Sequence, residues 1–207
     1  MQFKTVRGLK WPAIDQEMMM VMDYKEDLRR IQPFLENKRV AIQAGGAAGI
    51  WPMALANIFN TVYTFEPNPE HFICLCENTN CYDNIIRFQS ALGNEKDFVE
   101  MNTSIYPTNT GAWFVQKGGV TPTLKIDDFR FPVVDFICLD IEGYEVNALK
   151  GAIHTLVEHQ PLVMIESKQL RHYKDIGIEN GDSDRFLLSM GYKELDRIHR
   201  DVIYGPS

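Results

Sequence analysis

The stretch Arg39-Val-Ala-Ile-Gln-Ala-Gly-Gly-Ala-Ala-Gly-Ile50, followed by Val62-Tyr-Thr-Phe-Glu-Pro67, decides the fold. Residues 40–44 are a short apolar run, typical of a strand that is buried on both faces. The glycines that follow predict a tight turn from this strand into a helix over residues 50–59, because glycine lets backbone approach a ligand closely. They are Gly45, Gly46 and Gly49.

Glu66 ends the second predicted strand, which covers residues 61–65. An acidic side chain in this position accepts hydrogen bonds from both hydroxyl groups of a ribose. The glycine turn and Glu66 together therefore predict a site for a nucleoside cofactor. A dinucleotide site would show Gly-x-Gly-x-x-Gly, and no pair of glycines in this turn has the single-residue gap, so the signal for NAD is weak.

The composition is that of a globular domain. Of the 207 residues, 45% are hydrophobic and 24% are charged, and this length fits one structural domain with its own core. We expect an N-terminal extension and helix over residues 1–37 and a cofactor-binding domain over residues 38–207. The net charge of −7 argues against a broad basic surface for nucleic acid. The sequence also lacks an apolar run of about 18 residues, so no membrane span is expected.

The N-terminal residues show no secretory signal pattern, and the protein is expected to be cytoplasmic. The cysteines agree with this, because three of the four crowd one predicted helix and cannot frame a set of disulfides. A metal held by Cys74, Cys76, Cys81 and His71 is the alternative. Cys74 and Cys76 face different sides of a helix and the spacing is not that of a zinc site, so no metal is expected.

Strands and helices alternate along the rest of the chain. We predict further strands over residues 85–92, 133–141 and 162–166, and helices over 70–80, 149–157 and 183–190. The last two segments, 193–199 and 201–204, have the spacing of an antiparallel edge pair. This alternation predicts an α/β fold: a doubly wound, mostly parallel sheet with an antiparallel C-terminal hairpin at its edge.

Two regions are less regular. Residues 1–14 are expected to form an extended lead-in to a helix that starts at Asp15 and packs across the sheet edge. The alternative is a lid that places Trp11 or Tyr24 over the active site. Residues 111–116 and 120–126 are expected to pair as a hairpin within an insertion, 95–130, that contacts the substrate.

Polar residues and glycines gather at the predicted carboxyl ends of the strands, where parallel α/β sheets bind their ligands. These positions are residues 43–49, Glu66, Ser90, Ala91, residues 140–144 and Glu166. We expect them to meet in one crevice.

Several motifs follow one another in a recognisable order: Phe65-Glu-Pro-Asn-Pro69, Glu77-Asn78, Leu124-Lys-Ile-Asp-Asp128, Asp140-Ile-Glu-Gly-Tyr-Glu145, Leu149-Lys-Gly-Ala152 and Ile165-Glu166. Over residues 38–168 the chain resembles the S-adenosylmethionine-dependent methyltransferases, and more closely the FkbM-type family. The resemblance implies a Rossmann-like class I methyltransferase domain over residues 38–207. It also implies S-adenosyl-L-methionine as the cofactor.

The resemblance further implies which residues form the site. Cofactor-binding residues would be Gln43, Gly45, Gly46, Gly49, Glu66, Asn68, Ser90, Ala91 and Asp140. Among these, Glu66 would hold the ribose hydroxyls, and Ser90 and Ala91 would lie near the adenine. The candidate bases are Asp140, Glu142 and Glu166, followed at a distance by His172. Three alternatives remain. Asp140 could hold the amine of the cofactor and leave Glu142 as the base, Glu142 could cap the next helix, or a divalent metal could bind at Asp140, as in catechol-type O-methyltransferases.

The expected reaction is O-methylation of a hydroxyl group on a small molecule or glycan, with N-methylation of an amine left open. Gln43, Ala47 and Cys138 depart from the family pattern of Asp, Asn and Lys. A catalytically silent cofactor binder is therefore one alternative, and an NAD-linked oxidoreductase is another. A basic cluster, Lys168, Arg171, His172 and Lys174, is expected to be a solvated loop or a site for an anionic group. The sequence does not specify the oligomeric state.

Overall fold

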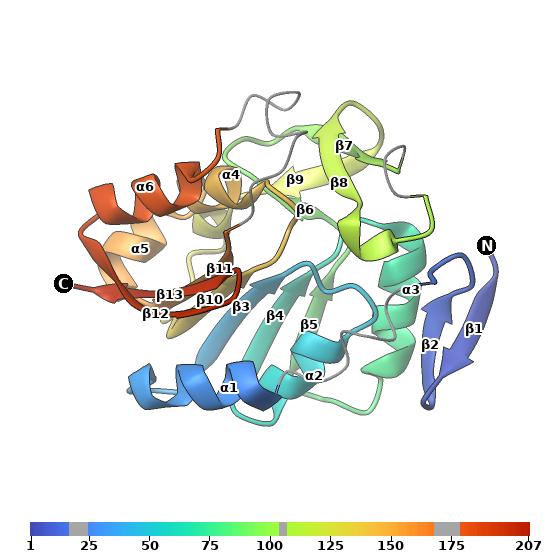
Figure 1. Ribbon diagram of the computed structural model, residues 1–207, viewed down its shortest axis with the longest axis horizontal. Helices are drawn as coiled ribbons and strands as arrows, with labels where there is room; N and C mark the ends of the chain where they lie inside the picture. Colours follow the sequence, from blue (N-terminus) through green and yellow to red (C-terminus); the bar gives the residue numbers. More distant parts are fainter. Residues whose placement is uncertain (17–24, 104–106, 168–178) are drawn as a thin grey trace.

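The computed structural model describes residues 1–16, 25–103, 107–167 and 179–207 (Figure 1). At its centre lies a seven-stranded sheet with the strand order β12-β13-β11-β10-β3-β4-β5. In chain order the strands are Val40–Ala44 (β3), Thr61–Phe65 (β4), Ile85–Phe88 (β5), Phe136–Leu139 (β10), Leu162–Glu166 (β11), Tyr192–Ile198 (β12) and Asp201–Pro206 (β13). The strands from β11 to β5 run parallel, whereas β13 pairs antiparallel with both β11 and β12. The predicted fold class is confirmed.

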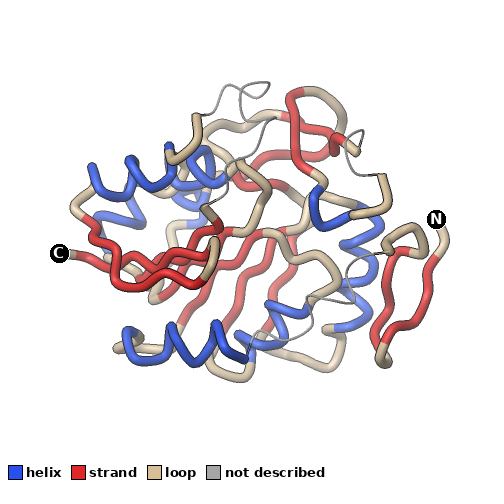
Figure 2. The backbone as a smooth tube through the Cα atoms, in the orientation of Figure 1, coloured by secondary structure: helices blue, strands red, loops and turns tan. Residues whose placement is uncertain are grey.

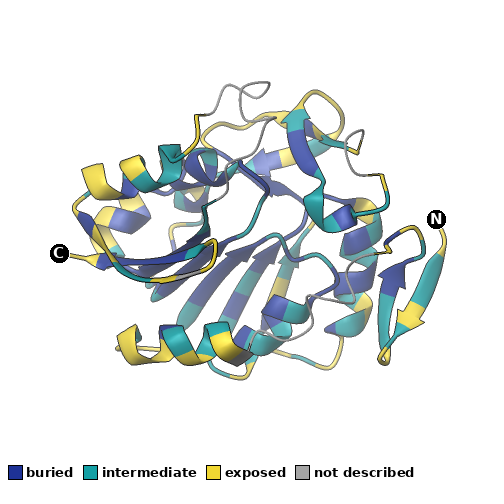
Figure 3. Cartoon of the chain, viewed as in Figure 1, coloured by how far each residue is buried: buried dark blue, intermediate teal, exposed yellow. Residues whose placement is uncertain are grey.

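The central strands are short apolar runs because helices cover both of their faces. Every residue of β10 is buried, as are all but one of the residues of β3 and of β11, and Figure 3 shows these strands as the most buried part of the chain. No helix among the described residues is long and apolar enough to cross a membrane.

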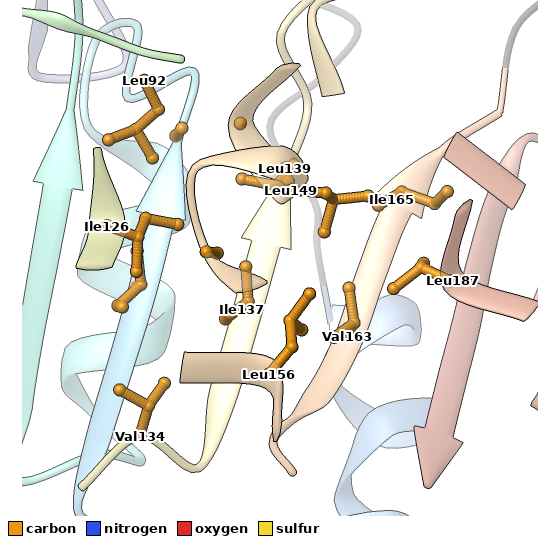
Figure 4. Packing of buried hydrophobic residues seen from close by; sticks show 14 of the residues in the cluster. Leu92, Ile126, Val134, Ile137, Leu139, Leu149, Leu156, Val163, Ile165 and Leu187 are labelled. Atoms are coloured by element: carbon orange, nitrogen blue, oxygen red, sulfur yellow. The ribbon is translucent and has the colours of Figure 1, made fainter. Parts of the chain in front are cut away.

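Two layers of helices enclose the sheet. On one face, Lys25–Ile31 (α1) and Ile50–Ala56 (α2) pack through Ile31 and Leu55. On the other face, Glu145–Lys150 (α4), Ile153–His159 (α5) and Asp182–Ser189 (α6) contribute Leu149, Leu156 and Leu187 to the larger core cluster (Figure 4). Pro69–Asn78 (α3) follows β4. Short 3-10 turns within the described ranges are Gln32–Phe34 (η2), Thr110–Ala112 (η3) and Ile126–Phe129 (η4).

The helix predicted over residues 149–157 is broken into α4 and α5 at Gly151. A Cβ atom at this position would lie 2.0 Å from the carbonyl oxygen of Gly93, so only glycine allows the two backbones to cross. Asp127 then caps the start of α5 by accepting hydrogen bonds from the backbone N–H groups of His154 and Thr155, both at 2.9 Å. The motif over residues 149–152 therefore serves packing, and the motif over residues 124–128 serves helix capping.

A second sheet of four strands lies over the carboxyl ends of the central strands (Figure 2). Its order is β6-β9-β7-β8, with the bounds Ala91–Leu92 (β6), Phe98–Asn102 (β7), Phe114–Lys117 (β8) and Thr121–Leu124 (β9). The predicted hairpin is wrong, because β7 lies between β8 and β9 and pairs antiparallel with both. Val99 of β7 packs against Ala91 and Val115 in a small core, which favours this order. The strand predicted over residues 85–92 is likewise divided between the two sheets.

The N-terminal residues form a hairpin instead of an extended lead-in. Phe3–Val6 (β1) and Leu9–Pro12 (β2) pair antiparallel through a two-residue turn at Arg7 and Gly8, whose φ angles are 50° and 84°. Asn-Gly and Asp-Gly are the usual signals for such a turn, and Arg-Gly does not announce it. Trp11 is 2% exposed and packs against Ala48 and Cys74, so it does not act as a lid. Tyr24, the other lid candidate, lies outside the described residues.

Candidate active site

The strand order reverses between β3 and β10, and the site lies at this switch point. From β3 the chain builds the sheet outward through β4 and β5, and from β10 it builds outward through β11 on the other side. Gly45 follows β3 with a φ of +84°, and a Cβ atom there would lie 1.9 Å from the carbonyl oxygen of Asp140. Glycine is therefore required where the turn after β3 meets the residue that follows β10.

A cavity of about 490 Å³ opens at these strand ends. It brings together most of the predicted site residues, namely Gly45, Glu66, Ser90, Ala91, Asp140, Glu142 and Glu166. The insertion contributes a further wall that contains Met101, Trp113 and Val115. Nucleoside-sized ligands occupy cavities of a few hundred Å³ at such switch points.

Four predicted cofactor ligands do not line this cavity. The side chain of Gln43 is fully buried within the sheet, where it accepts a 2.6 Å hydrogen bond from the hydroxyl of Thr64. Asn68 caps α3 by accepting hydrogen bonds from the backbone N–H groups of Glu70 and His71. Gly46 and Gly49 face Leu75 of α3, against which they shape the turn. Direct contact of these four residues with a cofactor remains a prediction.

Glu66 is fixed by the backbone on both sides. Its carboxylate accepts hydrogen bonds from the N–H groups of Ala47 at 2.7 Å and Asn68 at 2.8 Å, one to each oxygen. The side chain is 4% exposed, and burial raises its pKa to about 7 although both N–H groups act to lower it. Each oxygen retains a lone pair, which is what a pair of vicinal hydroxyl groups requires.

His71 of α3 and Thr110 of η3 form a buried polar pair beside Glu66, and the sequence did not reveal this pair. Its Nε2 lies 2.8 Å from the hydroxyl of Thr110, and its Nδ1 lies 4.0 Å from a carboxylate oxygen of Glu66. The imidazole also stacks on the indole of Trp113. Burial lowers the pKa of His71 to about 4, so the ring is neutral at pH 7.

Three carboxylates meet at the ends of β10 and β11. Because Leu139 pairs with Ile165 in the parallel register, Asp140 and Glu166 leave the sheet side by side. Glu142 adopts a φ of 53°, and this left-handed residue folds the chain back toward them. One carboxylate oxygen from each of Asp140, Glu142 and Glu166 lies within 4.8 Å of the other two. All three predicted bases therefore share one place in the cavity.

Glu145 holds the turn that presents this cluster. Its carboxylate accepts hydrogen bonds from the N–H groups of Ile141 at 3.0 Å and Gly143 at 3.2 Å. Burial raises the pKa of Glu145 to about 7. The N-cap residue of α4 is Tyr144, so the alternative of Glu142 as a helix cap is wrong. The motif's second glutamate supports the turn, and this leaves Glu142 in the cavity wall.

The polar groups that line the cavity fit S-adenosylmethionine. The hydroxyl of Ser90 is buried and has no hydrogen-bond partner within the described ranges, although it lines the cavity. A buried polar atom of this kind favours a ligand that completes its bonding. Glu66 offers its remaining lone pairs to a ribose, and the three clustered carboxylates suit a cationic sulfonium.

The structure bears differently on the metal sites and the anion site that the sequence left as alternatives. Glu142 and Glu166 supply the additional oxygen ligands that a metal at Asp140 would need, yet such a cluster equally suits proton transfer, and the prediction of no metal is untested. The cysteines are free, and His71 bonds to Thr110. His172 and the basic cluster lie outside the residues that the structure describes.

The fold is that of the class I methyltransferases, whose members use S-adenosylmethionine. A model of the FkbM methyltransferase domain matches residues 52–194, and the chain belongs to this family. This membership favours the methyltransferase prediction over an NAD-linked oxidoreductase. A comparison with curated proteins gives no significant match.

Solved structures support the fold. The FkbM methyltransferase from Methylobacillus flagellatus superposes with a TM-score of 0.59 and 20% identity, over 84% of this chain and 45% of that one. The chain thus spans less than half of that protein. The N-methyltransferase NodS from Bradyrhizobium japonicum superposes with a TM-score of 0.52 and 11% identity, over 93% of this chain and 99% of NodS. At these identities the similarity concerns the fold.

Proposed function

We propose that the protein transfers a methyl group from S-adenosylmethionine to a hydroxyl oxygen of a small molecule or glycan. The bound cofactor supplies an electrophilic methyl group on a sulfonium. The protein then has to position the acceptor and remove its proton. The observation that carries the proposal is the clustering of Asp140, Glu142 and Glu166 within 4.8 Å at the cavity wall.

In this proposal Asp140 is the general base. It follows β10 and contacts the glycine turn, so it lies where the cofactor and the acceptor would meet. Glu142 and Glu166 accept hydrogen bonds from further hydroxyl groups of the acceptor and hold it in line. Glu66 orients the ribose, and Ser90, which also lines the cavity, pairs with the nucleoside.

The carboxylate cluster favours a hydroxyl over an amine as the acceptor. An alkylamine beside three carboxylates would bind as an ammonium ion, which has no lone pair to receive a methyl group. A neutral hydroxyl keeps its lone pairs and gives its proton to the base. The cavity is also lined by apolar and aromatic side chains, Met101, Trp113 and Val115, which suit the ring of a small molecule or sugar.

A mass-detected screen of hydroxylated acceptors with isotopically labelled donor tests the proposal. The expected result is a product labelled on oxygen, whose formation Asp140→Asn should slow by about two to four orders of magnitude. Label found only on nitrogen would overturn the O-methyl assignment. Binding of S-adenosylhomocysteine without turnover on any acceptor would instead favour the silent cofactor binder.

A further inference from the structure

The N-terminal hairpin, β1 and β2, packs directly behind the glycine turn although it precedes the segment that matches the family. Trp11 of β2 is buried against Ala48 of the turn and Cys74 of α3. This hydrophobic contact places the backbone of β2 beside the last residue of α3, Asn78.

The side chain of Asn78 joins the hairpin to the turn. Its Oδ1 accepts a 2.7 Å hydrogen bond from the N–H of Lys10, and its Nδ2 donates to the carbonyl of Lys10 at 2.9 Å. The same Nδ2 donates to the carbonyl of Ala48 at 2.8 Å. One amide group thus satisfies three backbone groups from two segments that are distant in sequence.

The turn needs such support. Ala47 has a φ of 43°, a left-handed conformation that an L-residue with a Cβ adopts only when its surroundings impose it. Its N–H nevertheless has to point at Glu66, to which it donates at 2.7 Å. The bond from Asn78 to the carbonyl of Ala48 fixes the Ala48–Gly49 peptide, so the chain is held directly beyond Ala47 and relaxation of the turn is opposed.

We propose that Asn78 is a positioning residue for the cofactor, through which the N-terminal hairpin braces the Ala47–Ala48 turn and keeps Glu66 in its ribose-binding orientation. The inference rests on the proposed cofactor site. It assigns a role to residues 3–12, which lie outside the family match. The brace acts on cofactor affinity and leaves the acceptor side of the cavity unchanged.

Binding of S-adenosylhomocysteine to the full chain, measured by calorimetry, tests the proposal. Asn78→Asp keeps the shape and the acceptor for Lys10 but removes both donated bonds, and Asn78→Ala removes all three. We expect each variant to bind about tenfold more weakly, as one to two lost hydrogen bonds imply, with kcat at saturating donor within about twofold of the wild type. Glu77→Gln is the matched control, because it breaks only the surface ion pair with Lys10 and should bind as the wild type does.

The outcomes separate the brace from the proposed function. A wild type that does not bind S-adenosylhomocysteine would refute the cofactor site and the brace with it. A wild type that binds, together with an Asn78→Asp variant of equal affinity, would refute the brace alone. Should Asn78→Ala fail to fold, Asn78→Asp decides, and amide hydrogen exchange at Ala47 provides a second readout that should accelerate in this variant and not in Glu77→Gln.

Discussion

The backbone N–H of Ala47 donates a 2.7 Å hydrogen bond to the carboxylate of Glu66, and this bond ties the glycine turn after β3 to the end of β4. It orients a carboxylate that burial would otherwise disfavour in its charged form. The same bond makes the conformation of the turn and the affinity for a ribose interdependent. The predictions below test this relationship and the chemistry of the carboxylate cluster of Asp140, Glu142 and Glu166.

Replacing Glu66 by Gln should weaken the binding of S-adenosylhomocysteine by about ten- to a hundredfold, because hydrogen bonds to a charged acceptor are lost. Glu70→Gln, in the first turn of α3, changes a charge outside the cavity and serves as the control for titration calorimetry. Equal affinities for Glu66→Gln and the wild type would mean that the ribose lies elsewhere.

The affinity of the wild type should also rise with pH up to about 7. Burial raises the pKa of Glu66 to about 7, so at lower pH the group is protonated and has to lose its proton to accept both hydroxyl groups. In Glu66→Gln this pH dependence should disappear. Calorimetry at pH 5.5, 6.5 and 7.5 in both proteins decides the matter, since parallel curves would exclude Glu66 as the titrating group.

Asp140→Asn should lower kcat by about two to four orders of magnitude, the usual contribution of a general base. Glu142→Gln and Glu166→Gln should chiefly raise the KM of the acceptor, because these side chains are proposed to hold it. Asp128→Asn, a carboxylate outside the cavity, serves as the control. A larger loss of kcat in Glu142→Gln than in Asp140→Asn would exchange the two roles.

The free energy of unfolding of the cofactor-free protein should depend on pH through its buried acids. The folded state keeps protons on Glu66 and Glu145 that the unfolded chain releases between pH 4.5 and 7, so both groups lower stability as pH rises through this window. Burial lowers the pKa of His71 to about 4, and this group acts in the opposite direction up to pH 6.5. Urea unfolding isolates one contribution: the stability of Glu66→Gln relative to the wild type should increase from pH 4.5 to 7 and then level off.

Gly45→Ala should destabilise the protein by at least about 3 kcal/mol, through left-handed strain and overlap with the carbonyl of Asp140. Gly8→Ala is a matched control, because Gly8 has the same φ of +84° but open space around its Cα. We expect about 1 kcal/mol for that variant. Similar losses of unfolding free energy for the two variants would show that the close approach of Gly45 to the carbonyl of Asp140 does not affect stability.

Much of the candidate site could be predicted because parallel strands bring their carboxyl ends to one edge. Asp140 and Glu166 were expected there from the strand pattern alone, and the register of β10 with β11 confirms their adjacency. Glu142 could not be placed in this way, because its position depends on a left-handed turn beyond the strand. The side chain of Gln43 bonds to Thr64 within the sheet, and its predicted contact with the cofactor stays a prediction.

The errors in the predicted fold, and the unnoticed role of His71, arise where long-range contacts outweigh local signals. Gly118 and Gly119 suggested a hairpin between β8 and β9, but β7 occupies the place between them. His71 carried no interpretable pattern, because its partner Thr110 is 39 residues away in the chain. The N-terminal hairpin was missed since its turn uses Arg7 in a left-handed conformation.

The crossing of Gly93 and Gly151 has an evolutionary consequence. The insertion leaves the core at Gly93 and returns at Leu124, whose carbonyl accepts a 2.9 Å hydrogen bond from the N–H of Gly93, so its two ends are neighbours in space. The interior of a loop anchored in this way can be replaced while the anchor and the cofactor-binding ends of β3 and β4 stay in place. The part of the cavity wall that this segment contributes, with Met101, Trp113 and Val115, can thus change without displacing the strand ends that carry Glu66 and Asp140.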